Sequence, residues 1–600
     1  MRLPMEECIS SALSLFTSPQ PNWDICNHDL SEGCVCSGSH LRYTVLQGEP
    51  YDGIGRLPTE MLAEIFVHAL SSFNVGDFAP DTVHWKRIDQ ALVIMGVCHR
   101  WRQVMLARVF SRIVWNKIPC SARSGNFVEL LLERSKDQPI SLNIAHPSAD
   151  ENHRMTLYKL VSTQDRIESL CVFGWRARVA IPFSRPEMSF PRLHTLVLSS
   201  SAPYCDVRPC DSTIDQRTLG CSRLPSLRTL RILTHTHLLA TRMAASLQEL
   251  QLHCVRNQMD LIQSLAHVPF LRILKLDRLY DAEDVYHNLP PPTSIPSTFL
   301  KGEYAIPTRV PLDALQVLTV LWAGGAALAT FLGSLSIPES ATVFTRCLVE
   351  SERDQQAWPD LAQVVTRHLR DDGDFGVSSV RMQIRWPISQ EGAIMVQCLS
   401  PSTDTSTNLV TLHPRLTLHV HSRNHLSYSD VLVELSRCIP PHAVADLQIR
   451  SSDVRPRNGA FVDLAFPAIF ACFPNVGTLE LFGNIAPALY ALSLPSSYLS
   501  CSVTMHRLHD LILHDTSSQT MSRIAELQQL LRLLHRVRSF SNVASVLIKQ
   551  TIWSPLHHEE RLDAIFAVDD KPAEIMMGMQ RLVEALATRF NPSRKPRSTM

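Results

Sequence analysis

The stretch Val268-Pro269-Phe270-Leu271-Arg272-Ile273-Leu274-Lys275-Leu276 contains the unit that decides the fold of this chain. An apolar residue stands directly before a proline, and because proline cannot continue a helix, it separates a preceding helix from the next element. Leu274 and Leu276 then stand two residues apart, as side chains on one face of a strand do. The stretch therefore predicts the end of a helix, a turn, and a β-strand with one buried face.

The same apolar spacing recurs between residues 167 and 548. Its apolar positions are Ile167/Leu170/Val172, Leu193/Leu196/Leu198, Leu227/Leu230/Ile232, Leu247/Leu250/Leu252, Leu271/Leu274/Leu276, Leu315/Leu318/Val320, Val377/Val380/Met382, Val444/Leu447/Ile449, Val476/Leu479/Leu481, Leu508/Leu511/Leu513 and Val543/Val546/Ile548. An apolar residue followed by proline also precedes three other units, at Phe190-Pro191, Leu224-Pro225 and Phe473-Pro474. Spacings of about 20 to 35 residues are typical of stacked repeats, whose neighbouring units share a continuous core.

Between these units lie segments whose apolar residues recur with a helical period. The apolar faces are Leu261/Ile262/Leu265/Val268, Leu361/Val364/Val365/Leu369, Val431/Leu432/Leu435/Ile439 and Ile524/Leu527/Leu531/Leu534/Val537. A short helix at 127–135 and a strand at 139–144 precede the first unit, and a further helix is predicted at 576–590. The order of helix, turn and strand predicts an α/β solenoid, and it resembles an irregular leucine-rich-repeat horseshoe.

Two features make this solenoid irregular. Regular leucine-rich repeats carry an Asn or Cys shortly after the strand, and His253-Cys254 is the nearest example here. Polar or proline-rich segments interrupt the pattern at 199–221, 289–311 and 400–408. The alternative is a generic α/β domain in which leucine-rich strands recur by chance.

A different pattern occupies residues 57–115. Proline suits the first helical position, so Pro58 predicts the start of a helix, and the helix dipole favours a carboxylate such as Glu60 in the first turn. The apolar stripe of this helix is Leu62, Ile65, Phe66, Ala69 and Leu70. After a polar insertion at 71–90, a second stripe comprises Ile94, Val97, Cys98, Trp101 and Val104 or Met105. Helices of about 12 to 15 residues are marginal alone, so both predict a packing partner.

This stretch resembles an F-box, whose pattern is Leu-Pro-x-Glu, an apolar helix, Val-Cys-x-x-Trp-Arg and a closing aromatic residue. The matching residues are Leu57, Pro58, Glu60, Ile65, Phe66, Leu70, Val97, Cys98, Trp101, Arg102 and Trp115. The long insertion and the sequence Val97-Cys98-His99-Arg100-Trp101-Arg102 are similar to the F-box proteins of mushroom-forming fungi. The usual Pro-x-Leu-Trp end is replaced by residues 108–115.

The resemblance implies the substrate-recognition subunit of a cullin-RING (SCF-type) ubiquitin ligase. The F-box would dock on a Skp-type adaptor, and through it on a cullin, while the repeats would hold an unknown protein target. The residues implied to face the adaptor are Leu57, Pro58, Glu60, Leu62, Ile65, Phe66, Leu70, Val97, Cys98 and Trp101. Such a receptor needs no catalytic residue and no cofactor of its own.

Two alternatives to the ligase role remain open. The 57–115 stretch could be an ordinary helical hairpin packed on the chain's own core. The whole chain could also be a repeat-based interaction scaffold with no ligase role, in which these helices cap the end of the solenoid. We expect an enzyme least of all.

Composition excludes several classes of partner. Lys plus Arg number 57 and Asp plus Glu also number 57, so no net field attracts nucleic acid or a membrane surface. The hydrophobic content of 45% is that of a folded protein. Sixteen cysteines are too few for a disulfide scaffold, which favours a reducing compartment, the cytoplasm or the nucleus.

The sequence contains no catalytic motif. Phosphate loops, dinucleotide-binding fingerprints, nucleophile elbows and zinc-protease motifs are all absent. Asp374-Phe375-Gly376 matches the metal-binding tripeptide of kinases but has none of the other kinase motifs before it, so we interpret it as a chance match. Histidines such as His253, His368 and His535 are expected to be satisfied polar residues and not general bases.

Two further segments and the domain boundaries complete the prediction. Cys26, His28, Cys34, Cys36 and His40 cluster near the start, but their one-residue gaps are too tight for a zinc knuckle, so no metal site is expected. Residues 314–338 carry no charge, yet Gly324-Gly325 interrupts them, which favours a buried strand and helix over a membrane span. We divide the chain into a leader at 1–50, an F-box at 51–118, a solenoid at 119–570 and a terminal helix and tail at 571–600.

Overall fold

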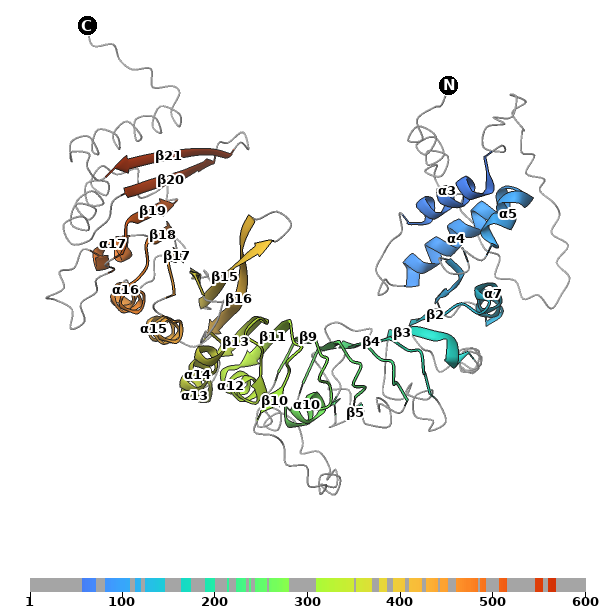
Figure 1. The fold of residues 1–600 in the computed structure, drawn as a ribbon, viewed down its shortest axis with the longest axis horizontal. Coiled ribbons are helices and arrows are strands. Elements are labelled where there is room, and N and C mark those ends of the chain that lie inside the picture. Colours follow the sequence, from blue (N-terminus) through green and yellow to red (C-terminus); the bar gives the residue numbers. More distant parts are fainter. Residues whose placement is uncertain are drawn as a thin grey trace, which may run out of the picture. The chain divides into compact units, whose positions relative to one another are not determined.

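A large, mainly parallel β-sheet with helices along it forms the framework of the chain (Figure 1). The computed structural model describes residues 57–71, 81–107, 110, 114–119, 125–145, 163–173, 189–199, 213–214, 223–233, 237–238, 243–255, 258–279, 309–349, 352–369, 377–385, 392–404, 409–422, 428–440, 443–451, 460–483, 486–492, 505, 507–514, 545–553 and 559–567. The leader, the Cys/His cluster, the kinase-like tripeptide and the helices predicted at 524–537 and 576–590 lie outside these ranges.

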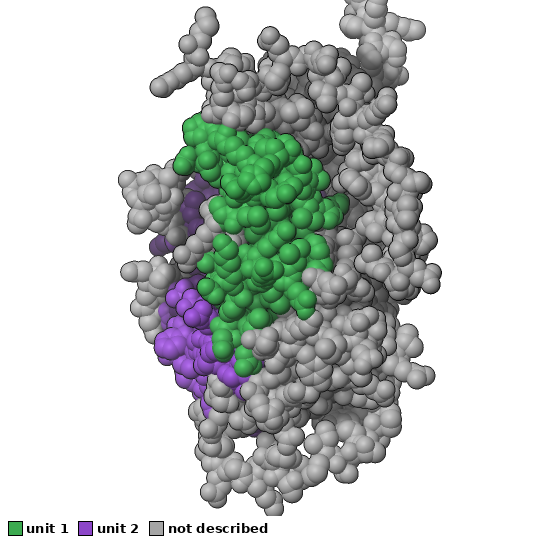
Figure 2. Space-filling view, turned by 90° about the vertical axis from the view of Figure 1, so that its right-hand side faces the viewer, with its two compact units in different colours: residues 1–174 green, residues 175–600 purple. Residues whose placement is uncertain are grey.

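The chain divides into two compact units, residues 1–174 and residues 175–600, which Figure 2 colours separately. The first contains the helices α3 (Thr59–Ser71), α4 (Asp81–Val97), α5 (His99–Met105) and α7 (Gly125–Ser135). Its strands β1 (Lys117–Pro119), β2 (Ile140–Ala145) and β3 (Ile167–Phe173) pair in parallel, and α4 packs against β1 and β2. A short 3₁₀ helix (Gln164–Arg166) leads into β3.

The second unit begins with a run of parallel strands in chain order. These are β4 (Thr195–Ser199), β6 (Thr229–Leu233), β8 (Glu249–Leu252), β9 (Ile273–Leu276), β11 (Val317–Gly324) and β13 (Thr342–Val349). Each pairs in parallel with the next. Two small parallel pairs lie apart from this sheet, β5 (Thr213–Ile214) with β7 (His237–Leu238) and β10 (Val310–Pro311) with β12 (Leu335–Ser336).

A turn with a repeated hydrogen bond precedes most strands. The amide of Leu271 donates to the carbonyl of Val268 at 3.2 Å, and equivalent bonds join Leu193 to Phe190 and Leu227 to Leu224. The amides of Arg272 and Ile273 both donate to the carbonyl of Gln248 in the preceding repeat. The proline after the apolar residue suits the second position of such a turn because its φ is preset.

The leucine spacing predicts the strands correctly. Each of the eleven predicted units falls on a strand, and all of the apolar residues from Ile167 to Leu513 in these units are buried, most with less than 3% exposure. The final unit lies on β20 (Ser545–Trp553). The predicted strand at 139–144 is β2, and the predicted helix at 127–135 is α7.

The later part of the sheet contains a reversal that the sequence pattern did not predict. β15 (Gly392–Asp404) and β16 (Leu409–Ser422) form an antiparallel hairpin, and β14 (Ser379–Arg385) pairs antiparallel with β15. β16 pairs in parallel with β13, and β14 pairs in parallel with β17 (Asp446–Ser451). The segment 400–408, predicted as an interruption of the repeats, instead contains the end of β15 nearest the turn of the hairpin.

After the hairpin the parallel order resumes. β17 pairs with β18 (Thr478–Gly483), β18 with β19 (Asp510–His514) and β19 with β20. β21 (Glu559–Ala567) pairs antiparallel with β20. In this unit the helices lie along one side of the strands, and consecutive helices pack on one another (Figure 1). They are α10 (Gln258–Leu265), α12 (Gly325–Gly333), α13 (Glu352–Gln356), α14 (Trp358–Leu369), α15 (Tyr428–Cys438), α16 (Ala460–Cys472) and α17 (Ala486–Leu492).

The uncharged segment 314–338 forms β11, α12 and β12, as predicted for a buried strand and helix. None of the described helices combines the length and apolar character needed to cross a membrane. The helices predicted around Leu261, Leu361 and Leu432 are α10, α14 and α15. The fold of the described residues is thus a mixed α/β arrangement consistent with a leucine-rich-repeat-like solenoid.

Candidate interaction surfaces of the helical unit and the sheet

The helices α3, α4 and α5 pack together around an aromatic cluster. The ring of Phe66 lies 4.9 Å from that of Trp101, edge to face, and 6.3 Å from that of Phe110. Trp115 is fully buried, and its indole nitrogen donates a hydrogen bond of 3.0 Å to the carbonyl of Met105. The guanidinium of Arg134 lies 4.9 Å over the Trp115 ring. The closing aromatic residue of the sequence pattern therefore anchors the core of this unit.

The second apolar stripe is divided between two helices. Cys98 adopts an extended conformation between α4 and α5, and its sulfur accepts a hydrogen bond from the amide of Trp101 at 3.5 Å. The prediction of one continuous helix through this stripe is therefore wrong. Val97 and Cys98 are exposed, while Val104 and Met105 are buried. The predicted insertion is also shorter than expected, because α4 already begins at Asp81.

The residues expected to face an adaptor fall into three groups. Leu62, Phe66 and Leu70 are buried in the unit's own core, each with 1% exposure. Leu57, Ile65 and Trp101 are half-buried. The exposed members are Pro58, Glu60, Val97 and Cys98.

The same helices expose several apolar side chains, of which the sequence pattern singled out Val97 but neither Val93 nor Met61. Val93 and Val97 are each 55% exposed and lie one helical turn apart on α4, and Met61 is 40% exposed on α3. The guanidinium of Arg100 donates to the carbonyl of Leu57, which ties α5 to the start of α3. Because α4 ends at the break before Cys98, the helical period alone did not reveal which side chains reach solvent.

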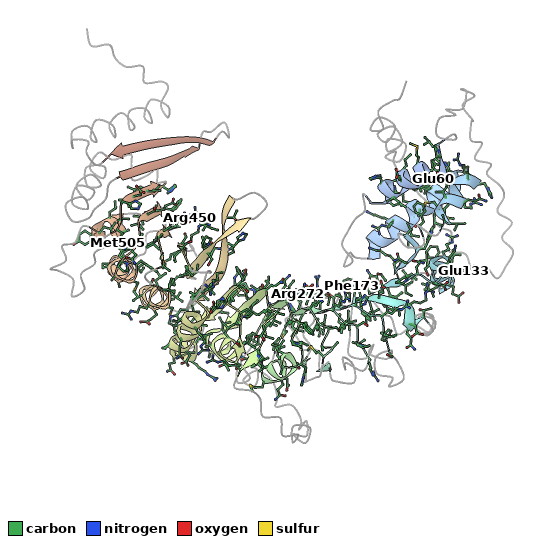
Figure 3. The ribbon with its side chains drawn as sticks, viewed as in Figure 1. Glu60, Glu133, Phe173, Arg272, Arg450 and Met505 are labelled. Atoms are coloured by element: carbon green, nitrogen blue, oxygen red, sulfur yellow. The ribbon has the colours of Figure 1, made fainter. Side chains whose placement is uncertain are left out.

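The strands of the second unit have a buried face and an open face. On the open face Arg231 and Glu249 of neighbouring strands form an ion pair of 2.9 Å. His253 and Asp277, which follow β8 and β9, are 3.1 Å apart. In Figure 3 Arg450 lies on the open side of the strands and Met505 on the side of the helices.

A bulge in β11 brings an indole onto the open face. The pairing of β11 with β13 shifts register between Val320 and Ala323, and Trp322 there has a φ of 52° and is 42% exposed. The guanidinium of Arg346 lies 4.4 Å over the indole, and the ring of His421 is 5.6 Å away. The ring of His419 lies 6.5 Å from His421.

A second stack lies further along the open face. The guanidinium of Arg450 is 4.6 Å from the ring of Phe482, and the ring of His514 stacks on Phe482 at 3.9 Å. Glu480 accepts a hydrogen bond of 2.7 Å from Gln448 and lies 3.6 Å from His514. Neither Arg346 nor Arg450 forms an ion pair within the described part of the chain.

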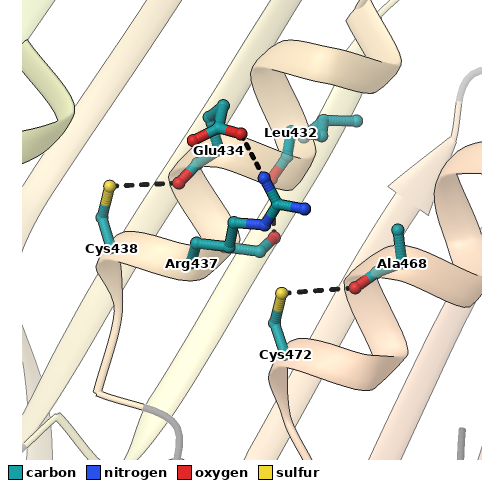
Figure 4. Close-up of polar contacts among 7 residues, drawn as sticks. Leu432, Glu434, Arg437, Cys438, Ala468 and Cys472 are labelled. Carbon is teal, nitrogen blue, oxygen red and sulfur yellow. Dashed lines mark hydrogen bonds and ion pairs between the residues drawn. The ribbon is translucent and has the colours of Figure 1, made fainter. Parts of the chain in front are cut away.

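Burial raises the pKa of several cysteine thiols in the second unit. Desolvation raises the pKa of the Cys398 thiol to about 12 and that of Cys472 to about 11, and it also raises the pKa of Cys438. The thiols of Cys438 and Cys472 donate to carbonyls one turn earlier, as Figure 4 shows for Glu434 and Ala468. Such protonated thiols are weak nucleophiles.

His368 is the most strongly shifted histidine among the described residues. Burial lowers the pKa of His368 to about 4, and the nearby positive charge of Arg415 contributes in the same direction. The guanidinium of Arg415 donates to the carbonyl of His368 at 2.9 Å. Within the described ranges no group of three or more His, Cys, Asp or Glu side chains is placed to hold a metal ion.

Comparison with known proteins finds similarity to a solved structure but to no family model or curated protein. No protein-family model matches the chain, and no curated protein matches it. The chain is similar to the crystal structure of the leucine-rich repeat-containing protein LegL7 from Legionella pneumophila, with 11% sequence identity and a TM-score of 0.19. This similarity covers 62% of the present chain and 98% of LegL7.

Proposed function

We propose that this chain is the substrate-recognition subunit of an SCF-type cullin-RING ubiquitin ligase, acting in the cytoplasm or the nucleus. The first unit would dock on a Skp-type adaptor, and the open face of the sheet would hold a protein target. Holding a target beside a ubiquitin-charged enzyme raises its effective concentration, which can supply several kcal/mol of the barrier without a catalytic group in this chain.

The observation that carries the proposal is the apolar surface around the F-box-like residues. Four apolar residues of this unit are exposed although its core is filled by other side chains: Pro58, Met61, Val93 and Val97. Exposed apolar side chains on a small helical unit favour a protein partner, because their removal from water by a partner is favourable in free energy. Phe66, in contrast, would stabilise the unit and not touch the adaptor.

Co-purification of the full chain with a Skp-type adaptor tests this role. We expect Val97→Arg to weaken the interaction by at least about tenfold, because a charge would replace an exposed apolar side chain that would contact the adaptor. Arginine at the end of α4 is compatible with the helix dipole, so the unit should stay folded. The matched control is Phe270→Arg, at an apolar residue that is 61% exposed in the second unit. Equal retention of adaptor by both variants would contradict the proposal.

A repeat-based scaffold with no ligase role is the second candidate. The packing of Phe66 on Trp101 and Phe110 favours it, since a unit that completes its own core also serves as a cap for a solenoid. This candidate predicts that the full chain recovers target proteins from cells but recovers neither adaptor nor cullin.

A further inference from the structure

One line of residues crosses the open face of the sheet without a carboxylate. Strand register aligns Arg346 with His419, His419 with Met395, Met395 with Gln383, Gln383 with Arg450, and Arg450 with Phe482. We call these six residues the basic row. Its guanidiniums, Arg346 and Arg450, are separated by four strand spacings, or about 19 Å.

We propose that the basic row is the binding site for an extended, acidic peptide segment of a partner protein. The segment would run across the strands and place carboxylates on Arg346 and Arg450. Because an extended chain advances about 3.3 Å per residue, two acidic positions about six residues apart would match the two guanidiniums. This target site rests on the proposed role of the sheet in holding a protein.

Charge complementarity supports an acidic occupant. The nearby carboxylate of Glu480 lies outside the row and accepts a hydrogen bond from Gln448, and neither arginine of the row forms an ion pair among the described residues. The Nε of Arg346 is buried and makes no hydrogen bond among the described residues. Planar guanidiniums present donors in a fork that fits a carboxylate, and stacking on a ring fixes the orientation of that fork.

The aromatic rings near the basic row are already covered by other side chains, which favours a peptide ligand over single-stranded nucleic acid. Proteins bind single strands by stacking bases on open aromatic faces. Here Arg450 and His514 lie against Phe482 at 4.6 and 3.9 Å, and Arg346 covers the Trp322 ring at 4.4 Å. Bases would have to displace these groups, whereas carboxylates can reach the guanidinium edges without moving a ring.

The backbone conformation at Trp322, which positions the indole, is strained. A φ of 52° is unusual for a bulky residue and costs of order 1 kcal/mol or more. Strain of this kind persists where the surrounding structure imposes it, and it gathers at ligand-binding sites. The bulge places the indole beneath Arg346, so it orients one end of the basic row.

Selection of a random peptide library displayed on phage against the full-length chain tests the proposal. We expect enrichment of peptides with acidic residues about six positions apart. Arg346→Gln and Arg450→Gln should each lower the affinity of a selected peptide about tenfold, as measured by fluorescence anisotropy. The affinity of Arg450→Lys for the peptide should lie between those of the parent and Arg450→Gln, because lysine keeps the charge but loses the planar fork.

The matched control is Arg437→Gln on α15, whose side chain is 62% exposed and pairs with Glu434 (Figure 4). It should leave affinity unchanged, and all variants should unfold at temperatures close to that of the parent. Selected peptides without acidic enrichment, equal losses in Arg437→Gln and Arg450→Gln, or binding of oligouridylate in preference to the peptides would each overturn the proposal. Val97→Arg should retain peptide binding, so failure of the adaptor role and failure of the basic row are distinguishable.

Discussion

The helical unit and the open face of the sheet use their aromatic side chains in opposite ways. In the helical unit Phe66, Phe110 and Trp115 are fully buried, and the first two pack on one another. On the sheet Trp322 and Phe482 stay on the open face and are partnered by guanidiniums. Since a buried aromatic contributes far more to stability than a surface stack, the first set holds its unit together and the second set is available for recognition.

The largest expected difference is in the free energy of unfolding, between truncation of a buried aromatic residue in the helical unit and truncation of one on the open face of the sheet. Phe66→Ala should destabilise the helical unit by about 3 to 5 kcal/mol because it opens a cavity in a closed core. Phe482→Ala should cost about 1 kcal/mol or less, since it removes surface stacking with Arg450 and His514. Hydrogen exchange of α3 and β18 in the full chain measures both values. Similar losses at the two sites would refute the contrast.

An intermediate effect is expected from acid on the second unit. The pKa of His368 is about 4 in the folded chain against an ordinary value of 6.5, so above pH 6.5 it is neutral in both states. Between these values the unfolded chain binds a proton that the folded chain does not, so stability falls as the pH falls, by up to about 3 kcal/mol. Hydrogen exchange of α14 at pH 7 and pH 4.5 measures the loss. His368→Gln should flatten this dependence, and an unchanged slope would exclude His368 as its source.

The smallest effect on stability is expected at the bulge. Trp322→Gly relieves the backbone strain at a φ of 52° and loses the stack with Arg346, so the free energy of unfolding should change by about 1 kcal/mol at most. Peptide affinity should nevertheless drop, because the orientation of Arg346 is lost. Thermal unfolding and anisotropy on the same preparation separate the two quantities. Unchanged affinity would place Trp322 outside the site.

Sequence was sufficient wherever one local rule governed the structure. Leu271, Leu274 and Leu276 are buried because the repeated spacing leaves their face toward the core. The hairpin was not predicted because its strands contain Pro401 and Pro414, and a proline in a sequence usually indicates that a strand is interrupted. Strand β13 was not predicted because the buried Thr345 occupies a position where the other units carry an apolar residue.

The candidate surfaces were harder to predict because they depend on exceptions to periodicity. The helical period runs through Cys98, but an extended backbone there changes which side chains reach solvent. Trp322 lies in an apolar run and faces solvent only because of a register shift. The basic row joins strands through a reversal, so Arg346 and Arg450 become aligned by pairings that no repeat spacing encodes.

The reversal at β14 to β16 also affects how the chain can be assembled. Chain order places β14 after β13, but the strand that follows β13 in the sheet is β16, and β14 lies between β15 and β17. A solenoid can normally add each repeat to the growing edge as it is synthesised. Here the edge of the sheet at β13 stays unpaired until the hairpin of β15 and β16 has formed. Addition of strands to the sheet from the amino-terminal side therefore cannot continue past β13 before that step.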